Sequence, residues 1–221
     1  TDVRWLGRHR KIAALATQLE DYPPYKAPHT ENHLSLSDSQ AMENLAYLQE
    51  NRATRIDHLH ALLARHGMDL KLALTNARHE PLIEALYRWA QSEWQGAVPE
   101  NVISRAIWRK TDRQGDEIIY SLAMDCAIAL GEIVMQHRPD FAWNVDLEPD
   151  NLKDQMPSAR RVVLQAPSLL HPGQSVHVDW EALTVAILLN PLSASNRAIN
   201  LWQRVANEAI TGQTQGQVQD L

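Results

Sequence analysis

The stretch from Asp116 to Trp143, DEIIYSLAMDCAIALGEIVMQHRPDFAW, decides the fold class, because it joins a long apolar segment to a proline and an alternating segment. At 100° per residue, positions 118–137 present apolar or small side chains on nearly every side. A helix of this kind belongs in the middle of a helical bundle. After Pro139, apolar and polar side chains alternate up to Glu148, which is the period of a half-buried strand.

The flanking sequence extends this pattern into an α+β fold, predominantly a helical bundle around a central buried helix with a small antiparallel sheet. Ser37-x-x-Gln40 has the form of a capping box, and Gly67 is a matching stop, so a long helix is predicted between them. Further helices are predicted within 3–20 and at 82–94, 100–110, 180–189 and 195–210, and further strands at 161–165 and 175–178.

We expect a single domain over residues 1–221. Its parts are an N-terminal helix and proline-rich loop (1–36), a helical body (37–138), a small sheet (139–178), C-terminal helices (179–210) and a polar tail (211–221). The single cysteine, Cys126, excludes an internal disulfide and falls inside the apolar helix, which indicates a reducing compartment. We therefore expect a cytoplasmic protein.

The charge balance disfavours a nucleic-acid partner. The chain has 21 Lys and Arg against 27 Asp and Glu, a formal charge of −6, which favours basic protein partners instead. The basic residues Arg105, Arg109, Lys110 and Arg113 form a short local group that we interpret as a solvated helix face. No window approaches the roughly 18 uninterrupted apolar residues of a membrane span, so no membrane contact is expected.

Two acidic residues interrupt the apolar pattern of the central helix, and they are its candidate catalytic residues. Asp125 and Glu132 are seven positions apart, so they point the same way with about 10 Å of axial rise between them. This is too far for a shared proton, but the two carboxylates could flank a substrate together with a histidine such as His177. The alternative is that each accepts hydrogen bonds from Trp, Arg or backbone in a packed core.

No other motif points to catalysis, and no metal or cofactor is expected. The ten histidines lack the spacing of a closed metal site, and no Gly-x-Ser-x-Gly elbow or phosphate-binding glycine motif is present. Trp94 and Trp108 lie near predicted helix ends and are candidates to anchor a protein partner. Asp146 and Glu148, on the polar face of the first strand, are further candidate binding residues.

Several short motifs resemble an uncharacterised bacterial protein family in which a helix containing Leu-Gly-Glu precedes a strand begun by Pro and Trp. They are Tyr120-Ser121-Leu122 through Asp125, Leu130-Gly131-Glu132, Arg138-Pro139, Trp143, His66-Gly67-Met68-Asp69-Leu70, and Glu80-Pro81-Leu82 leading to Trp89. Some members resemble immunity or accessory proteins of bacterial toxin and secretion systems. The resemblance implies protein binding and carries over no catalytic residue.

The function expected from the sequence is a cytoplasmic protein-binding module, most concretely an immunity-type protein that binds and occludes a bacterial toxin with a basic domain. One alternative is a small hydrolase-like enzyme that uses Asp125 and Glu132 with His177. The other is a scaffold that forms homo-oligomers through the C-terminal helix and tail.

Overall fold

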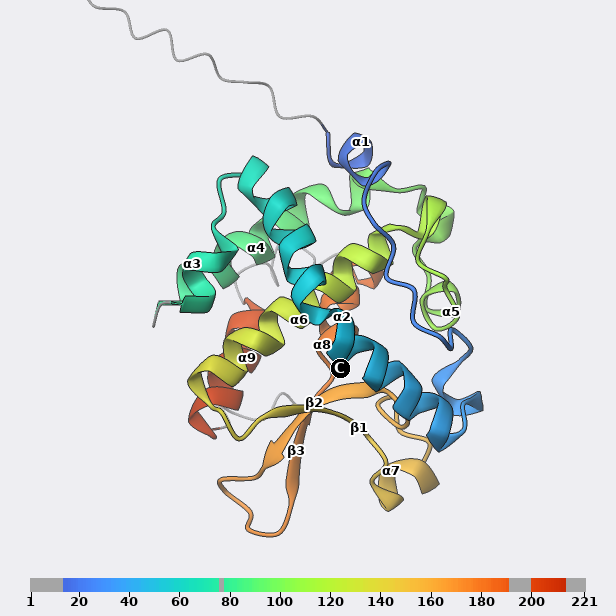
Figure 1. Ribbon diagram of the computed structural model, residues 1–221, viewed down its shortest axis with the longest axis vertical. Coiled ribbons are helices and arrows are strands. Elements are labelled where there is room, and N and C mark those ends of the chain that lie inside the picture. Colours follow the sequence, from blue (N-terminus) through green and yellow to red (C-terminus); the bar gives the residue numbers. More distant parts are fainter. Residues whose placement is uncertain (1–13, 76–77, 191–199, 214–221) are drawn as a thin grey trace, which may run out of the picture.

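The computed structural model describes residues 14–75, 78–190 and 200–213. Its helices surround α6 (Ile119–His137), and a three-stranded antiparallel sheet lies at one end of the helical body (Figure 1). This confirms the predicted α+β class. The other helices are α1 (Leu15–Leu19), α2 (Asp38–Arg65), α3 (Leu70–Thr75), α4 (Glu80–Glu93), α5 (Arg105–Trp108), α7 (Pro149–Lys153), α8 (Trp180–Leu189) and α9 (Leu201–Thr211).

The central helix α6 is buried because apolar or small side chains surround it. Every residue from Ile119 to Gly131 is buried, and α8 packs along the helix more extensively than any other described element. The segment Gly115–His137 is long and apolar enough to cross a membrane by length and composition, but 89% of its apolar window is buried inside the structure. That burial is typical of a core helix.

The sheet follows α6 directly. Its strands are β1 (Ala142–Val145), β2 (Val162–Pro167) and β3 (Ser175–Val178), in the order β1-β2-β3, and both pairs are antiparallel. Trp143 points inward from β1 and packs on Gly131, where an added Cβ would lie 2.2 Å from the indole. A glycine at position 131 therefore allows the sheet to approach α6 closely.

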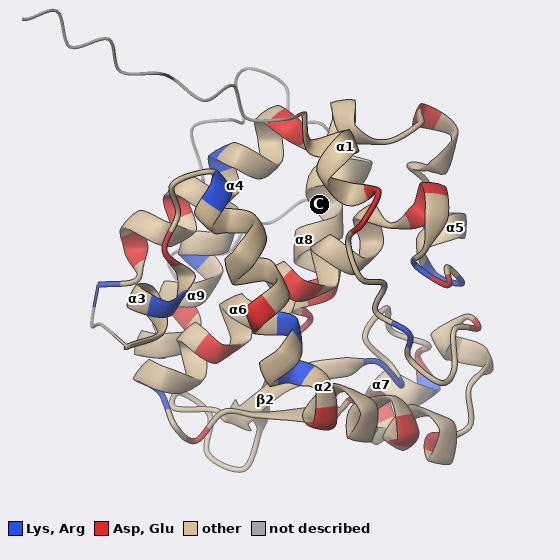
Figure 2. Ribbon diagram, turned by 45° about the horizontal axis from the view of Figure 1, so that its top comes forward, with Lys and Arg blue, Asp and Glu red and all other residues tan. Residues whose placement is uncertain are grey.

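Helix α2 begins at the predicted capping box. The Ser37 hydroxyl accepts from the Gln40 amide at 3.2 Å, and the Gln40 side chain accepts from the Ser37 amide at 2.8 Å. Gly67, at φ +74°, follows the helix end. Basic segments of α2 lie beside acidic segments of α6 (Figure 2).

The predicted continuous helix at 100–110 is wrong. A short 3-10 helix, η3 (Glu100–Val102), is separated from α5 by Ser104, which is extended at φ −151° and caps α5 by accepting from the Ile107 amide. Helix α3 was not predicted, and the expectations for residues 1–13, 195–199 and 214–221 lie outside the described residues.

Candidate functional site

Asp125 is part of a sealed ion pair between α6 and α2. Its carboxylate has no exposed surface and accepts from Arg55 Nε at 2.7 Å and Nη2 at 2.6 Å, while the Tyr22 hydroxyl donates to it at 2.5 Å. Burial raises the pKa of Asp125 to about 6, although the Arg55 hydrogen bonds oppose the shift, so the group is ionised at neutral pH. Arg55 also donates to the Pro23 carbonyl, at 2.8 Å. The cluster therefore anchors residues 22–36, the N-terminal strap, to the core.

The structure does not bring the three residues of the hydrolase-like alternative together. Glu132 is partly exposed and accepts from Arg52 at 3.0 Å and from the Trp143 indole at 3.3 Å. His177 lies on β3 and lines a different cavity, between the β2–β3 hairpin and α9. Because Asp125 is sealed from solvent, these groups cannot act on one substrate.

Two of the four predicted partner-binding residues, Trp94 and Asp146, are fully buried in the fold. Trp94 has no exposed surface and packs edge-on against Trp89, with 6.0 Å between ring centres. Asp146 is also fully buried, and its carboxylate accepts from the Asn151 side chain at 2.8 Å and from the Glu148 amide at 3.2 Å. Glu148 is half-buried at the start of α7.

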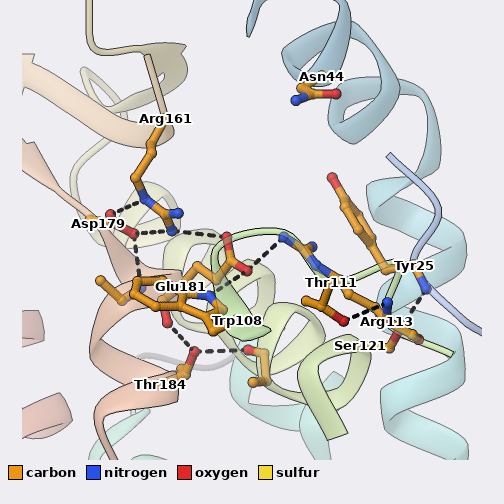
Figure 3. Close-up of polar contacts among 12 residues, drawn as sticks. Tyr25, Asn44, Trp108, Thr111, Arg113, Ser121, Arg161, Asp179, Glu181 and Thr184 are labelled. Carbon is orange, nitrogen blue, oxygen red and sulfur yellow. Dashed lines mark hydrogen bonds and ion pairs between the residues drawn. The ribbon is translucent and has the colours of Figure 1, made fainter. Parts of the chain in front are cut away.

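The fourth residue, Trp108, lines a cavity of about 70 Å³ between the N-terminal strap, the α5–α6 turn, β2 and the start of α8. The cavity wall is unusually rich in arginine for an acidic protein. We call it the arginine pocket and define it by His33, Trp108, Arg109, Arg113, Arg161 and Glu181. Figure 3 shows four of these residues, with Glu181 between the guanidinium groups of Arg161 and Arg113.

Local backbone structure holds these side chains in place. Asn32 caps the 3-10 helix η1 (His33–Ser35) by accepting from the Leu34 amide at 3.2 Å, which fixes the backbone at His33. Arg113 has a φ of +57°, and its amide donates to the Thr111 hydroxyl at 2.8 Å. Arg113 and Arg160, another wall residue, are two of the three non-glycine residues with positive φ in the part of the chain that the structure describes. Such strained backbone is concentrated at functional sites.

Glu181 is ionised, and its carboxylate accepts hydrogen bonds from three side chains. It accepts from Arg113 at 2.7 Å, from Arg161 at 3.0 Å and from the Trp108 indole at 3.2 Å. Burial alone would raise the pKa of Glu181, but the two guanidinium groups outweigh it and hold the pKa below its ordinary value. Arg161 also pairs with Asp179 at 2.6 Å and lies over the Trp108 ring, 4.6 Å from its centre.

Other polar atoms of the pocket have no partner among the described residues. Both ring nitrogens of His33 are buried and unbonded, as are Nε of Arg109 and Nη1 of Arg113. His33 is only 6% exposed. Burial, and then the charges of Arg161 and Arg109, lower the pKa of His33 to about 4, so the ring is neutral at physiological pH. Native proteins rarely leave such groups unpaired, and these four belong to residues that line one cavity, although the atoms themselves have almost no accessible surface.

The charged groups of the pocket differ in how they are paired. The wall holds Arg109, Arg113, Arg160 and Arg161 with the carboxylates of Glu31 and Glu181, and Asp38 and Asp179 pair with Arg160 and Arg161. Arg109 forms no ion pair with any described residue. Arg109 is thus the wall arginine that has no ion pair among the described residues.

Sequence reasoning missed this site. The available signal was the basic group at positions 105–113, but the sequence pattern alone indicates a solvated helix face there. The structure instead places half-buried Arg109 and Arg113 in the wall of the cavity. Among the described residues, no group of three or more His, Cys, Asp or Glu side chains is arranged to hold a metal ion.

Comparison with known proteins found no matching family model, no similar curated protein and no similar solved structure. The resemblance to bacterial immunity or accessory proteins therefore stays a prediction from sequence motifs. Any functional conclusion has to rest on the chemistry of the pocket itself.

Proposed function

We propose that the protein binds a small anionic molecule in the arginine pocket. The observation that supports this best is the cavity wall itself, which brings Arg109, Arg113, Arg160 and Arg161 together beside Trp108. An anion bound there would pair with the guanidinium of Arg109, which forms no ion pair with any described residue.

Water alone is a poor occupant of this pocket. Water molecules can satisfy the free donors and the free acceptor, but they carry no charge. With water alone, the half-buried Arg109 guanidinium would stay without an ion pair in a wall that holds three other arginines. An anion supplies a hydrogen-bond acceptor and a negative charge together.

The titratable groups of the pocket favour binding over catalysis. A general acid or base works best with a pKa near the operating pH. The pKa of His33 is about 4, Glu181 is held below its ordinary value by two arginines, and burial raises the pKa of Tyr25, another wall residue. Each group thus keeps one protonation state near neutral pH and acts as a fixed partner for a ligand.

The test is isothermal titration of the full chain with small anions in low-salt buffer, comparing the parent with Arg109→Gln. This substitution removes a guanidinium that forms no ion pair with any described residue, so it leaves the Glu181 ion pairs intact. We expect the parent to bind at least one small anion. The variant should bind the same anion at least about tenfold more weakly, because it has lost one charge-assisted hydrogen bond.

The matched control is Arg88→Gln, which removes an equal charge from the surface of α4, where the Arg88 side chain is 76% exposed. It should leave anion binding unchanged. Failure of every small anion to bind, or equal weakening by the two substitutions, would overturn the proposal. The immunity-type role rests on the sequence resemblance and is tested separately, by co-purification with the product of the neighbouring gene.

A further inference from the structure

A cavity of about 510 Å³ lies beside β3 and shares no lining residue with the arginine pocket. Its wall includes four consecutive residues, 176–179, but no residue of β2. Successive side chains of a strand point to opposite faces of the sheet, so a cavity over one face would meet only every second residue. The cavity therefore runs along the edge of β3. We call it the β3 groove and define it by residues 176–179, Leu169, Leu170, Leu183, Val205 and Ala209.

The hydrogen-bond pattern of the hairpin leaves this edge of the sheet without backbone partners. The Ser168 amide donates to the Gln174 carbonyl at 2.8 Å, and in an antiparallel pair such bonded positions alternate with unbonded ones. The N–H and C=O groups of Ser175 and His177 therefore point away from β2, and none of them is bonded to another described residue. A row of this kind is a template for pairing with a further strand.

The helices supply the apolar side of the groove. Leu183 of α8 contributes to it, and Leu169 and Leu170 lie at the tip of the hairpin, which projects from the helical body (Figure 1). Their exposed fractions are 58% and 54%. One face of α9 and its C-cap forms a further wall, through residues at helical spacing: Val205, Glu208, Ala209 and Gly212. The groove thus combines free backbone groups with apolar contact surface.

The charges around the groove show which kind of segment fits it. Each lining residue with a carboxylate or guanidinium group already has an ion pair: Arg138 with Asp140, Asp179 with Arg161, and Glu208 with Arg204. The strand Ser175–Val178 itself contains neither a proline nor a Lys, Arg, Asp or Glu, the residues that commonly block pairing at sheet edges. A charged side chain placed in the groove would find no free counterion among these residues, so an uncharged segment is the complementary occupant.

We propose that the β3 groove binds an extended, uncharged segment of a partner protein, which adds to the sheet as a fourth strand beside β3. The backbone of the segment pairs with the free N–H and C=O groups of Ser175 and His177. Every second side chain of the segment lies on the same face as the buried Val178 and is apolar. The cavity is bounded by β3 and α9 of one chain, which suits a single strand better than a second folded copy.

The probe is a phage-displayed library of random peptides of about eight residues, selected on the full chain, and the enriched peptides are then synthesised and titrated. We expect them to share an apolar residue at every second position. N-methylation of the backbone tests the strand pairing directly. Methyl groups on the alternate amides that face β3 should weaken binding about tenfold each, whereas those on the intervening amides should have little effect.

The variant His177→Pro removes one outward-facing N–H without removing a bond between β2 and β3. Proline is tolerated at such edge positions, and the preceding residue, Val176, is already in the extended conformation that proline requires. We expect peptide binding to weaken about tenfold. His177→Ala keeps the N–H and should keep the affinity, which separates the backbone from the imidazole. Thermal unfolding checks the fold of both variants.

A second variant tests the groove from α9 in case His177→Pro does not fold. Val205→Lys places a charge in the groove wall and should also weaken peptide binding. Its matched control is Met42→Lys, which replaces a 45% exposed apolar residue on α2 and should leave binding unchanged.

Several results would overturn the proposal. They are a selection that enriches no peptide, N-methyl effects that do not alternate, and equal weakening by His177→Ala and His177→Pro. A parent that is dimeric by light scattering and becomes monomeric as His177→Pro would assign the edge to a second copy. Peptide binding that appears only after deletion of residues 214–221 would assign the groove to the chain itself. None of these results depends on anion binding in the arginine pocket.

Discussion

Replacing Arg55 with methionine is the sharpest test of how the core is held together. In the parent, Arg55 is 5% exposed, forms two hydrogen bonds to the fully buried Asp125, and donates to the Pro23 carbonyl. Methionine fills a similar length of space but leaves a carboxylate in the core without a counterion. Breaking a buried pair in this way costs about 3–5 kcal/mol, a large fraction of the stability of a typical domain.

The loss should depend on pH in a definite direction. Burial already raises the pKa of Asp125 to about 6 against the opposing effect of Arg55, so without Arg55 the pKa rises further. A raised carboxyl pKa means that the folded state binds more protons than the unfolded state, and stability then falls as pH rises above about 4. Arg55→Met should accordingly be more destabilised at pH 8 than at pH 5.

The assay is urea unfolding of parent and variant at both pH values, followed by circular dichroism. Adding Asp125→Asn to the variant should recover most of the loss at pH 8, because the core then holds no charge. Lys71→Gln, which breaks the exposed pair with Asp57, should change the free energy of unfolding little at either pH. A loss below about 1 kcal/mol, or a loss equal at the two pH values, would refute the reasoning.

Three further predictions concern local features. Gly131→Ala should destabilise the protein by about 1–3 kcal/mol in urea unfolding, since the added methyl would overlap the Trp143 ring; an unchanged midpoint would contradict the packing described. Ser37→Ala should cost about 1 kcal/mol by loss of the α2 cap, with Ser39→Ala as the uncapped control. The lowered pKa of His33 means that the unfolded state binds more protons between about pH 4 and 6.5, so this residue makes stability rise with pH there. His33→Phe should flatten that rise, and an identical pH profile would contradict the burial of a neutral imidazole.

Much of the fold was predictable because it follows from periodicity and capping, which are local. The all-round apolar pattern of α6, the alternation of β1 and the capping box of α2 each depend on side chains a few positions apart. The break at Ser104 was not predictable in this way, because its partner lies on another element. There the Tyr120 hydroxyl donates to the Val102 carbonyl at 2.9 Å and accepts from the Ser104 amide at 3.3 Å.

The acids of the central helix show where local reasoning ends. The sequence places Asp125 and Glu132 on one stripe of the helix, and both in fact receive arginines from α2. Those arginines, Arg52 and Arg55, lie three positions apart, within or next to a polar segment that the sequence predicts to be exposed. A helical wheel shows which way a side chain points, but its partner on another helix depends on how the two helices pack.

Burial alone does not distinguish the Arg55–Asp125 cluster from the arginine pocket, but the pairing of the charged groups does. Arg55 and Asp125 are at least as buried as the residues of the arginine pocket, yet each has the other as a counterion and the cluster is complete. In the pocket, Glu181 is shared between two guanidinium groups and Arg109 has no counterion among the described residues. Arg109 thus lacks the ion pair that Arg55 has, which is why the functional proposal rests on the pocket and not on the acids of α6.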